Sequence, residues 1–309
     1  MRIALLCATR RGYRFLEKLS ALAPEHDLTV FSFRETPWEP PFLEAIADLS
    51  RTIGAQFIEA RSVSAPELRV FWDETPLDLM FTVSWRYLIP ADIYQRPRLG
   101  AFVFHDSLLP TYRGFSPTVW AMMNGEDHTG VTLFEMADDV DSGDIVAQKR
   151  VPIGETQAIG TVMEKVTDAY LDLLAENLPA LLAGTASRTP QHHEDATFTC
   201  KLLPEDHVIS WTDSTPTIYN LIRAVSAPYP GAFTTLNGQK LTIWEAEKVI
   251  PQPDYVGRIP GRVVSFQNGK GAEVLTGDGV LRLIRVQLEG EPIQPAEAVL
   301  NRIGYTLGR

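Results

Sequence analysis

The sequence reads LGAFVFHDSLLPTYRG from residue 99 to residue 114. Its apolar first part, residues 99–105, is typical of a buried strand that runs into a polar loop. A helix signal follows at once, because Ser116 suits an N-cap and Pro117 suits the first helical position. This order of strand, loop and helix places polar side chains at the carboxyl end of a strand.

Apolar runs of the same kind occur upstream. Strands are predicted at residues 2–7, 28–33 and 77–83, and helices at about 12–22 and 42–53. Continuous apolar strands that alternate with helices predict an α/β fold, whose mostly parallel sheet is covered on both faces. Such sheets bind ligands at the carboxyl ends of their strands, so chemistry is expected just after each run.

The second half of the chain changes character. Apolar residues at three- and four-residue spacing over 159–174 predict a long amphipathic helix that ends or kinks near Pro179. Residues 184–205 are polar and lack periodicity, as expected for a connector. Beyond them a helix at about 215–225 precedes β-rich sequence with turn pairs such as Asn237-Gly238, which predicts a small barrel or sandwich.

Length and charge narrow the classes of function. A chain of 309 residues exceeds what one hydrophobic core usually serves, so two domains are expected. The net charge is −11, and the acidic excess lies in residues 1–205, which hold 29 acidic and 18 basic side chains. Residues 206–309 hold 10 of each. Neither part is the basic body that nucleic-acid binding favours.

The sequence predicts neither a membrane nor a metal partner. It has no run of 18 apolar residues, and the first apolar run is too short for a signal peptide, so a cytoplasmic location is expected. The two cysteines, Cys7 and Cys200, form neither a disulfide framework nor a metal-ligand spacing.

Two polar segments are candidates for chemistry. His105 ends the strand at 99–105, and imidazole is easily poised as an acid or base, although a lone His is more often structural. Arg113 beside Gly114 is either an anion-binding pair or a surface arginine. The segment 137–145 holds four carboxylates without the spacing of a calcium loop. It is therefore a solvated acidic turn or the source of an Asp that pairs with a His.

A third candidate follows the first strand. Arg10, Arg11 and Gly12 lie where a parallel sheet of this kind usually meets phosphate, and glycine permits close backbone approach. The alternative is a solvated basic pair.

Joined motifs run through the chain. They read H-x-S-L-L-P-x-Y-R-G from His105, N-G-E from Asn124, T-G-V-T from Thr129, D-S-G-D-I-V from Asp141, Y-P-G-A-F from Tyr229 and G-D-G-V-L-R-L from Gly277. In this combination the chain resembles the folate-dependent formyltransferases. That family includes methionyl-tRNA formyltransferase and the enzymes that N-formylate the amino sugars of nucleotide sugars. The resemblance covers nearly the whole chain.

The resemblance implies a Rossmann-like formyltransferase domain over residues 1–190, a linker over 191–205 and a smaller OB-like β-barrel domain over 206–309. It implies that His105 and Asp141 are catalytic and that 10-formyltetrahydrofolate is the formyl donor. The pocket for this donor is expected to be lined by Trp85, Arg86, Leu88, Ile89, Asp138 and Val140. The substrate is expected to contact Arg10, Arg11, Gly12, Ser107, Tyr112, Arg113 and Gly114.

The leading hypothesis is transfer of the formyl group to the primary amine of a small substrate, above all an amino sugar of a nucleotide sugar. The amine attacks the formyl carbon, a tetrahedral intermediate forms, and His105, tuned by Asp141, moves the protons. Transfer RNA is the runner-up acceptor, because the charge distribution offers few phosphate contacts. The sequence leaves the oligomeric state open, with a homodimer as one alternative.

One position departs from the pattern of the family. Two residues before the catalytic His the family usually carries an Asn that helps hold the formyl oxygen, and this chain has Val103, which cannot donate a hydrogen bond. Loss of one such donor typically costs about 10²–10³ in rate. Either another donor replaces it, or the enzyme is slow, or the chain is a non-catalytic folate- or nucleotide-binding homologue. A hydrolase that passes the formyl group to water is a further alternative.

Overall fold

The computed structural model describes residues 1–37 and 39–309. These residues form two compact units. One consists of Met1–Pro117, Thr129–Pro152 and Glu164–Cys200, and is called the N-terminal unit here. The other, the C-terminal unit, consists of Thr118–His128, Ile153–Met163 and Lys201–Arg309. Each unit is thus assembled from segments that are distant in sequence.

A seven-stranded sheet forms the centre of the N-terminal unit, with the strand order β3-β2-β1-β4-β5-β7-β8. The strands are β1 (Arg2–Cys7), β2 (Asp27–Ser32), β3 (Gln56–Glu59), β4 (Leu79–Val83), β5 (Ala101–His105), β7 (His128–Glu135) and β8 (Ile145–Pro152). The first five strands in this order pair in parallel, and β7 runs antiparallel to β5. The predicted α/β fold with a mostly parallel sheet is confirmed.

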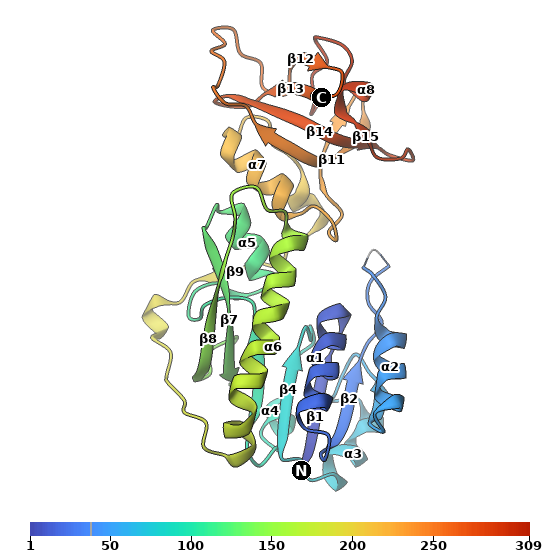
Figure 1. Ribbon diagram of the computed structural model, residues 1–309, viewed down its shortest axis with the longest axis vertical. Helices are drawn as coiled ribbons and strands as arrows, with labels where there is room; N and C mark the ends of the chain where they lie inside the picture. The colour runs from blue at the N-terminus through green and yellow to red at the C-terminus, as the bar shows by residue number, and fades with distance from the viewer. Residues whose placement is uncertain (38) are drawn as a thin grey trace. The chain divides into compact units, whose positions relative to one another are not determined.

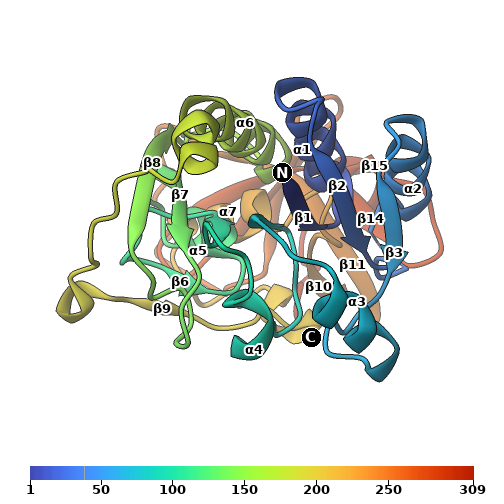
Figure 2. The same ribbon diagram turned by 90° about the horizontal axis from the view of Figure 1, so that it is seen from below.

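Helices cover both faces of this sheet. They are α1 (Thr9–Leu22), α2 (Leu43–Thr52), α3 (Arg69–Glu74), α4 (Ala91–Tyr94) and α6 (Ile159–Ala183). Helices α1 and α6 lie on one side of the sheet, and α3 and α4 lie on the other (Figure 2). Both faces of the strands are therefore buried, which explains why their sequences read as continuous apolar runs.

The two faces have separate cores. On the α1 and α6 face, the ring of Phe15 contacts Phe104 edge-on at 4.9 Å between centroids, and Tyr170 stacks on Phe104 at 5.4 Å. On the opposite face, Trp72 of α3 packs in one cluster with Ala101 of β5. Because side chains alternate along a strand, Val103 and His105 lie on the same face as Ala101.

Helix α6 continues past its internal proline. The sequence predicts an end or kink near Pro179, whereas α6 continues to Ala183. Proline removes one backbone donor from a helix interior. Leu178 and Leu181, before and after the proline, are both buried, so this last part of the helix still packs in the core.

An antiparallel sheet forms the C-terminal unit, in the order β10-β11-β14-β13-β12, with β15 paired to β14. Its strands are β10 (Ala232–Leu236), β11 (Gln239–Lys248), β12 (Val263–Gln267), β13 (Gly271–Leu275), β14 (Val280–Leu288) and β15 (Gln294–Pro295). Its helices are α5 (Pro117–Met123), α7 (Thr215–Ala224) and α8 (Ala296–Val299), and α7 packs against β11 (Figure 1). The predicted smaller β domain is confirmed.

The residue types in the turn favour the conformation of the first hairpin of this sheet. Asn237 and Gly238 both have positive φ, at 52° and 80°, between β10 and β11. That pattern is a type I′ turn, whose twist matches antiparallel strands.

Candidate active site

Three neighbouring strands end at one edge of the N-terminal sheet. They are β1, β4 and β5, whose carboxyl ends are followed by Ala8, Ser84 and Asp106. Parallel strands bring these ends together, so polar residues from three parts of the sequence meet there.

His105, the last residue of β5, is held by backbone on one side and faces a carboxylate on the other. The residue is 8% exposed. Its Nε2 lies 3.0 Å from the carbonyl oxygen of Tyr112. Because a carbonyl only accepts, Nε2 donates this hydrogen bond. Its Nδ1 lies 3.6 Å from Oδ2 of Asp141. The imidazole is thus fixed in orientation while Nδ1 stays beside a carboxylate.

Asp141 is placed by hydrogen bonds from two other segments of the chain. Its Oδ2 accepts a hydrogen bond from the backbone N–H of Gly114 at 2.7 Å. Its carbonyl oxygen, and that of Gly143, accept hydrogen bonds from Nε2 of Gln191 at 2.9 and 2.7 Å. The carboxylate that faces His105 is therefore positioned by three segments of chain.

Gly143 lets this loop approach β7, and we expect Gly143→Ala to disturb it. An added Cβ would lie 1.7 Å from the carbonyl oxygen of Glu135, so the loop backbone has to move. We expect the free energy of unfolding to fall by about 1–3 kcal/mol, as for overpacked sites. Urea denaturation measures this. Gly257→Ala, where a Cβ meets nothing within 4 Å, is the matched control, and equal stabilities would contradict the expectation.

A short two-stranded sheet supports the loop after β5. Strand β6 (Arg113–Gly114) pairs in parallel with β9 (Phe198–Thr199). The Arg113 side chain is buried, and its Nε and Nη2 donate to Oε1 of Gln191 at 3.2 and 2.6 Å. Arg113 thereby orients the residue that holds the Asp141 loop. Its predicted substrate contact stays a prediction.

Two aromatic and charged residues follow β4. Trp85 packs edge-on against Phe33 at 5.3 Å, and its indole Nε1 is buried with no hydrogen-bond partner in the described chain. Arg86 pairs with Glu39 and donates through Nη1 at 2.8 Å. Burial opposes ionisation of Glu39, but hydrogen bonds from Arg86 and Thr36 outweigh it and lower its pKa.

The other residues predicted for the donor pocket differ in exposure. Leu88 is 86% exposed and Val140 is 63% exposed, whereas Ile89 is buried in the core beside α4. Asp138 accepts a hydrogen bond from the hydroxyl of Tyr94. The exposed Leu88 and Val140 are available to a ligand, whereas Ile89 packs in the core. The predicted contacts of all these residues with the formyl donor stay predictions.

The basic pair after β1 is already engaged within the chain. Nη1 of Arg11 donates to both carboxylate oxygens of Asp106, at 2.6 and 2.9 Å, and the guanidinium lies 4.5 Å from the ring centre of Tyr170. Arg10 forms an exposed ion pair with Glu164. A Cβ on Gly12 would lie 2.9 Å from that of Cys7, so glycine lets α1 pack on β1.

A carboxylate of the chain itself lies at the start of α1. Oε1 of Glu35 accepts hydrogen bonds from the backbone N–H groups of Thr9 and Phe42, at 3.3 and 3.0 Å. Burial, with the Glu35 charge nearby, raises the pKa of the Cys7 thiol. A helix start is a common phosphate site in folds of this kind, and here a buried carboxylate lies beside it. Phosphate binding by Arg10, Arg11 and Gly12 stays a prediction.

The loop after His105 is internally bonded. The Ser107 hydroxyl donates to the carbonyl oxygen of Thr111 at 2.7 Å, and the backbone N–H of Tyr112 donates to Oγ1 of Thr197 at 2.8 Å. Thr132 Oγ1 accepts from the Leu109 N–H at 3.0 Å and so ties the loop to β7. Substrate contacts of Ser107, Tyr112 and Gly114 stay predictions.

Sequence comparison now adds to this geometry. A family model described as formyl transferase matches residues 21–178, and one described as formyl transferase, C-terminal domain, matches residues 201–304. The chain belongs to the formyl transferase family. The resemblance seen in the motifs and the enzyme class that it implied are confirmed at the level of the family.

Solved structures share the fold of this chain. HypX from Aquifex aeolicus in complex with tetrahydrofolic acid has 19% sequence identity and a TM-score of 0.63, covering 97% of this chain and 47% of that chain. The N-formyltransferase from Helicobacter canadensis in complex with folinic acid and dTDP-3-aminofucose has 14% identity and a TM-score of 0.66, covering 91% and 98%. Methionyl-tRNA formyltransferase from Clostridium thermocellum has 18% identity and a TM-score of 0.55, covering 89% and 99%. The chain spans about half the length of HypX.

Several residues around the candidate site have a strained backbone. Five non-glycine residues at or near the sheet edge have φ between 49° and 66°: Thr9, Ser84, Tyr112, Ser116 and Asp141. Such conformations cost about 1–3 kcal/mol each and persist where the surroundings determine them. The surrounding structure therefore fixes the conformation of the loops next to His105 and Asp141.

Sequence reasoning missed several residues that build this site. Gln191 and Thr197 lie in the stretch that reads as a connector, and no periodicity marks them. Thr132 is part of the motif T-G-V-T, but that motif does not show which loop it holds. Within 1–37 and 39–309, no group of three or more His, Cys, Asp or Glu side chains could hold a metal ion.

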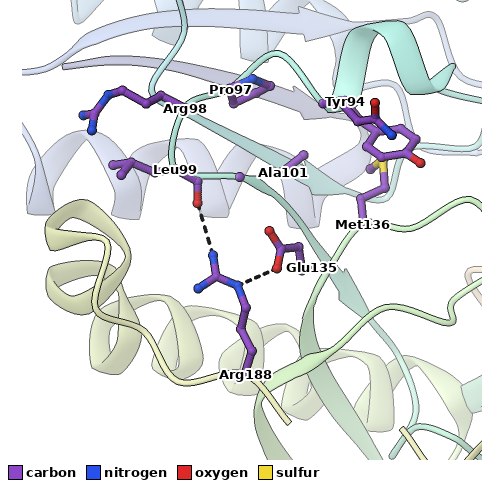
Figure 3. Close-up of a pocket in the computed structure, with 10 residues that line it drawn as sticks. Tyr94, Pro97, Arg98, Leu99, Ala101, Glu135, Met136 and Arg188 are labelled. Atoms are coloured by element: carbon purple, nitrogen blue, oxygen red, sulfur yellow. Dashed lines mark hydrogen bonds and ion pairs between the residues drawn. The ribbon is translucent and has the colours of Figure 1, made fainter. Parts of the chain in front are cut away.

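A separate pocket of about 320 Å³ lies at the amino end of β5, the end remote from His105 (Figure 3). Arg188 reaches across it, forms an ion pair with Glu135 and donates through Nη2 to the carbonyl oxygen of Leu99 at 3.3 Å. None of the helices in the described part of the chain has both the length and the apolar character needed to cross a bilayer.

Proposed function

We propose that this chain transfers a formyl group from 10-formyltetrahydrofolate to the primary amine of a small substrate. The observation that carries the proposal is the meeting of His105 and Asp141 at the carboxyl edge of the sheet, 3.6 Å apart between Nδ1 and Oδ2. HypX and the Helicobacter canadensis enzyme, which share the fold, hold tetrahydrofolic acid and folinic acid. Those complexes support a folate as the donor.

Residues at this edge fit a folate. Leu88 and Val140 expose apolar surface that a flat pterin ring can cover. The buried Nε1 of Trp85 offers an N–H without a partner among the described residues, which a ring acceptor can satisfy. When bound, the donor supplies the activated formyl group.

The residues of the chain handle protons. An attacking amine must lose a proton, and Oδ2 of Asp141 and Nδ1 of His105 are the two groups that lie beside each other to take it. The hydrogen bond from Nε2 to the carbonyl oxygen of Tyr112 fixes the ring for this role. Burial of His105 keeps bulk water from competing for the same nitrogen.

An amino sugar of a nucleotide sugar is the proposed acceptor. The fold shared with the Helicobacter canadensis enzyme in its dTDP-3-aminofucose complex supports this choice. The acidic excess of residues 1–205 disfavours transfer RNA, although methionyl-tRNA formyltransferase shares the fold and makes it the runner-up. A cytoplasmic location and a homodimer stay predictions.

Titration with 5-formyltetrahydrofolate, a non-reactive form of the donor, tests the folate site. We expect saturable binding by calorimetry and a Kd about 3–10-fold weaker in Trp85→Phe, which loses one hydrogen-bond donor. Trp72→Phe is the matched control, because its indole donates to the carbonyl oxygen of Val63 in the core. That variant should lose stability and keep its affinity. No binding up to millimolar ligand would exclude the folate site.

Turnover then separates the acceptors. Release of tetrahydrofolate that requires an amino sugar supports the proposal, and a higher kcat/KM with aminoacylated initiator tRNA overturns the choice of acceptor. Release without any amine identifies a hydrolase. Binding of the donor without release under any condition identifies a non-catalytic homologue.

A further inference from the structure

Thr82 lies on β4 directly beside Val103 of β5, the position at which β5 offers no hydrogen-bond donor. Its register partner on β5 is Val103, and its partner on β1 is Leu6. Paired residues of adjacent parallel strands point to the same face, so Thr82, Val103 and His105 share one face. Thr132 of β7, the register partner of His105, also lies on this face, but its hydroxyl already donates to the carbonyl oxygen of Ser107 at 2.6 Å.

The hydroxyl of Thr82 is an unexplained polar group. The residue is 6% exposed, and Oγ1 is buried with no hydrogen-bond partner within residues 1–37 and 39–309. A buried hydroxyl without a partner is destabilising, and valine has the same shape without that cost. Packing of the sheet therefore gives no reason for threonine at this position.

Formyl transfer needs a hydrogen-bond donor beside the formyl oxygen. Negative charge develops on the formyl oxygen as the amine attacks, and a preorganised hydrogen-bond donor stabilises it. Val103 has none to offer. The N–H of Nε2 in His105 donates to Tyr112, and the Gly114 N–H donates to Asp141. The hydroxyl of Thr82 has no such internal partner.

Distances in a parallel sheet fit this role. Adjacent strands lie about 4.8 Å apart and two residues along a strand span about 6.6 Å, so the Cα atoms of Thr82 and His105 are about 8 Å apart. A formyl group between the two side chains has its oxygen near one and its reacting carbon near the other.

We propose that Thr82 is a catalytic residue whose hydroxyl donates a hydrogen bond to the formyl oxygen during transfer, in the place that Val103 leaves without a donor. This inference rests on the proposed formyl transfer. It assigns the transition-state contact to β4 instead of β5.

The test is the isosteric variant Thr82→Val. We expect kcat for formyl transfer to fall about 10²–10³-fold. We expect the Kd for 5-formyltetrahydrofolate to stay within about 2-fold. We also expect Tm to rise by about 2–4 °C, because a buried unpaired hydroxyl is removed. Thr82→Ser, which keeps the hydroxyl, should retain most of the activity.

A second variant places a hydrogen-bond donor on β5 instead of β4. Adding Val103→Asn to Thr82→Val should restore at least about 10-fold of the lost kcat, since an amide N–H then lies beside the same oxygen. A purely structural role for Thr82 predicts no such rescue and a lower Tm.

The outcomes separate this inference from the function that it rests on. If the wild type transfers formyl groups and Thr82→Val keeps the wild-type kcat, the Thr82 hydroxyl does not donate the proposed hydrogen bond. A fall in kcat that comes with a lower Tm or a weaker Kd also overturns the role, because damage to the fold then explains it. If the wild type binds the folate and transfers nothing, the proposed function fails first and the role of Thr82 fails with it.

Discussion

Replacing Asp141 with Asn is expected to lower kcat about 10²–10⁴-fold, the range of general acid–base catalysis. The carboxylate lies beside Nδ1 of His105, and the neutral amide can neither take a proton nor stabilise an imidazolium. The amide oxygen can still accept the N–H of Gly114, so the loop should keep its conformation. Steady-state release of tetrahydrofolate in the presence of an amine measures the effect.

The matched control for this variant is Asp139→Asn. Asp139 is exposed two residues earlier in the same loop. This variant loses the same charge from the same segment, so it reports any general effect of charge on binding. Equal turnover in Asp141→Asn and in the wild type would show that the pair of His105 and Asp141 is not the catalytic machinery.

The largest loss of stability is expected from Arg11→Met. Arg11 and Asp106 form a two-fold hydrogen-bonded ion pair whose side chains are only 8% and 15% exposed. Removing the guanidinium leaves the Asp106 carboxylate buried without its counter-charge, which typically costs about 3–5 kcal/mol. Denaturation in urea, followed by far-UV circular dichroism, measures the free energy of unfolding.

Two further variants sharpen this experiment. Arg11→Met combined with Asp106→Leu removes both charges and should be more stable than the sum of the single losses predicts. Arg10→Met breaks an exposed ion pair with Glu164 and should cost less than about 1 kcal/mol. If Arg11 instead contacts the substrate, its variant will raise KM and leave the free energy of unfolding unchanged.

Much of the N-terminal fold was predictable, because its strands are buried on both faces and are separated by clear stop signals. The meeting of His105 with Asp141 followed from the motifs once the family resemblance was known. The partner of Arg11 was not predictable. An arginine after a first strand has the same local sequence whether it binds phosphate or a carboxylate, and only the folded chain brings Asp106, which follows β5, beside Arg11.

The support of the catalytic loop was also beyond sequence reasoning. Gln191 reads as one polar residue in a polar connector, and β6 and β9 are two-residue strands that leave no hydrophobic pattern. The unpaired hydroxyl of Thr82 could not be predicted either, although Thr82 lies in a segment with a clear hydrophobic pattern. It lies within an apolar strand, where threonine is a common residue and where burial of the hydroxyl cannot be read from the neighbours.

The left-handed backbone at Thr9, Ser84, Tyr112, Ser116 and Asp141 has a consequence for engineering this protein. Glycine relieves such conformations at little steric cost, so a search for thermally hardier variants will be drawn to these positions. Asp141 is itself one of the proposed reacting groups, and the carbonyl oxygen of Tyr112 holds the ring of His105. A library ranked by melting temperature alone will therefore select relaxed loops and lose turnover, whereas one ranked by both properties will leave this edge of the sheet untouched.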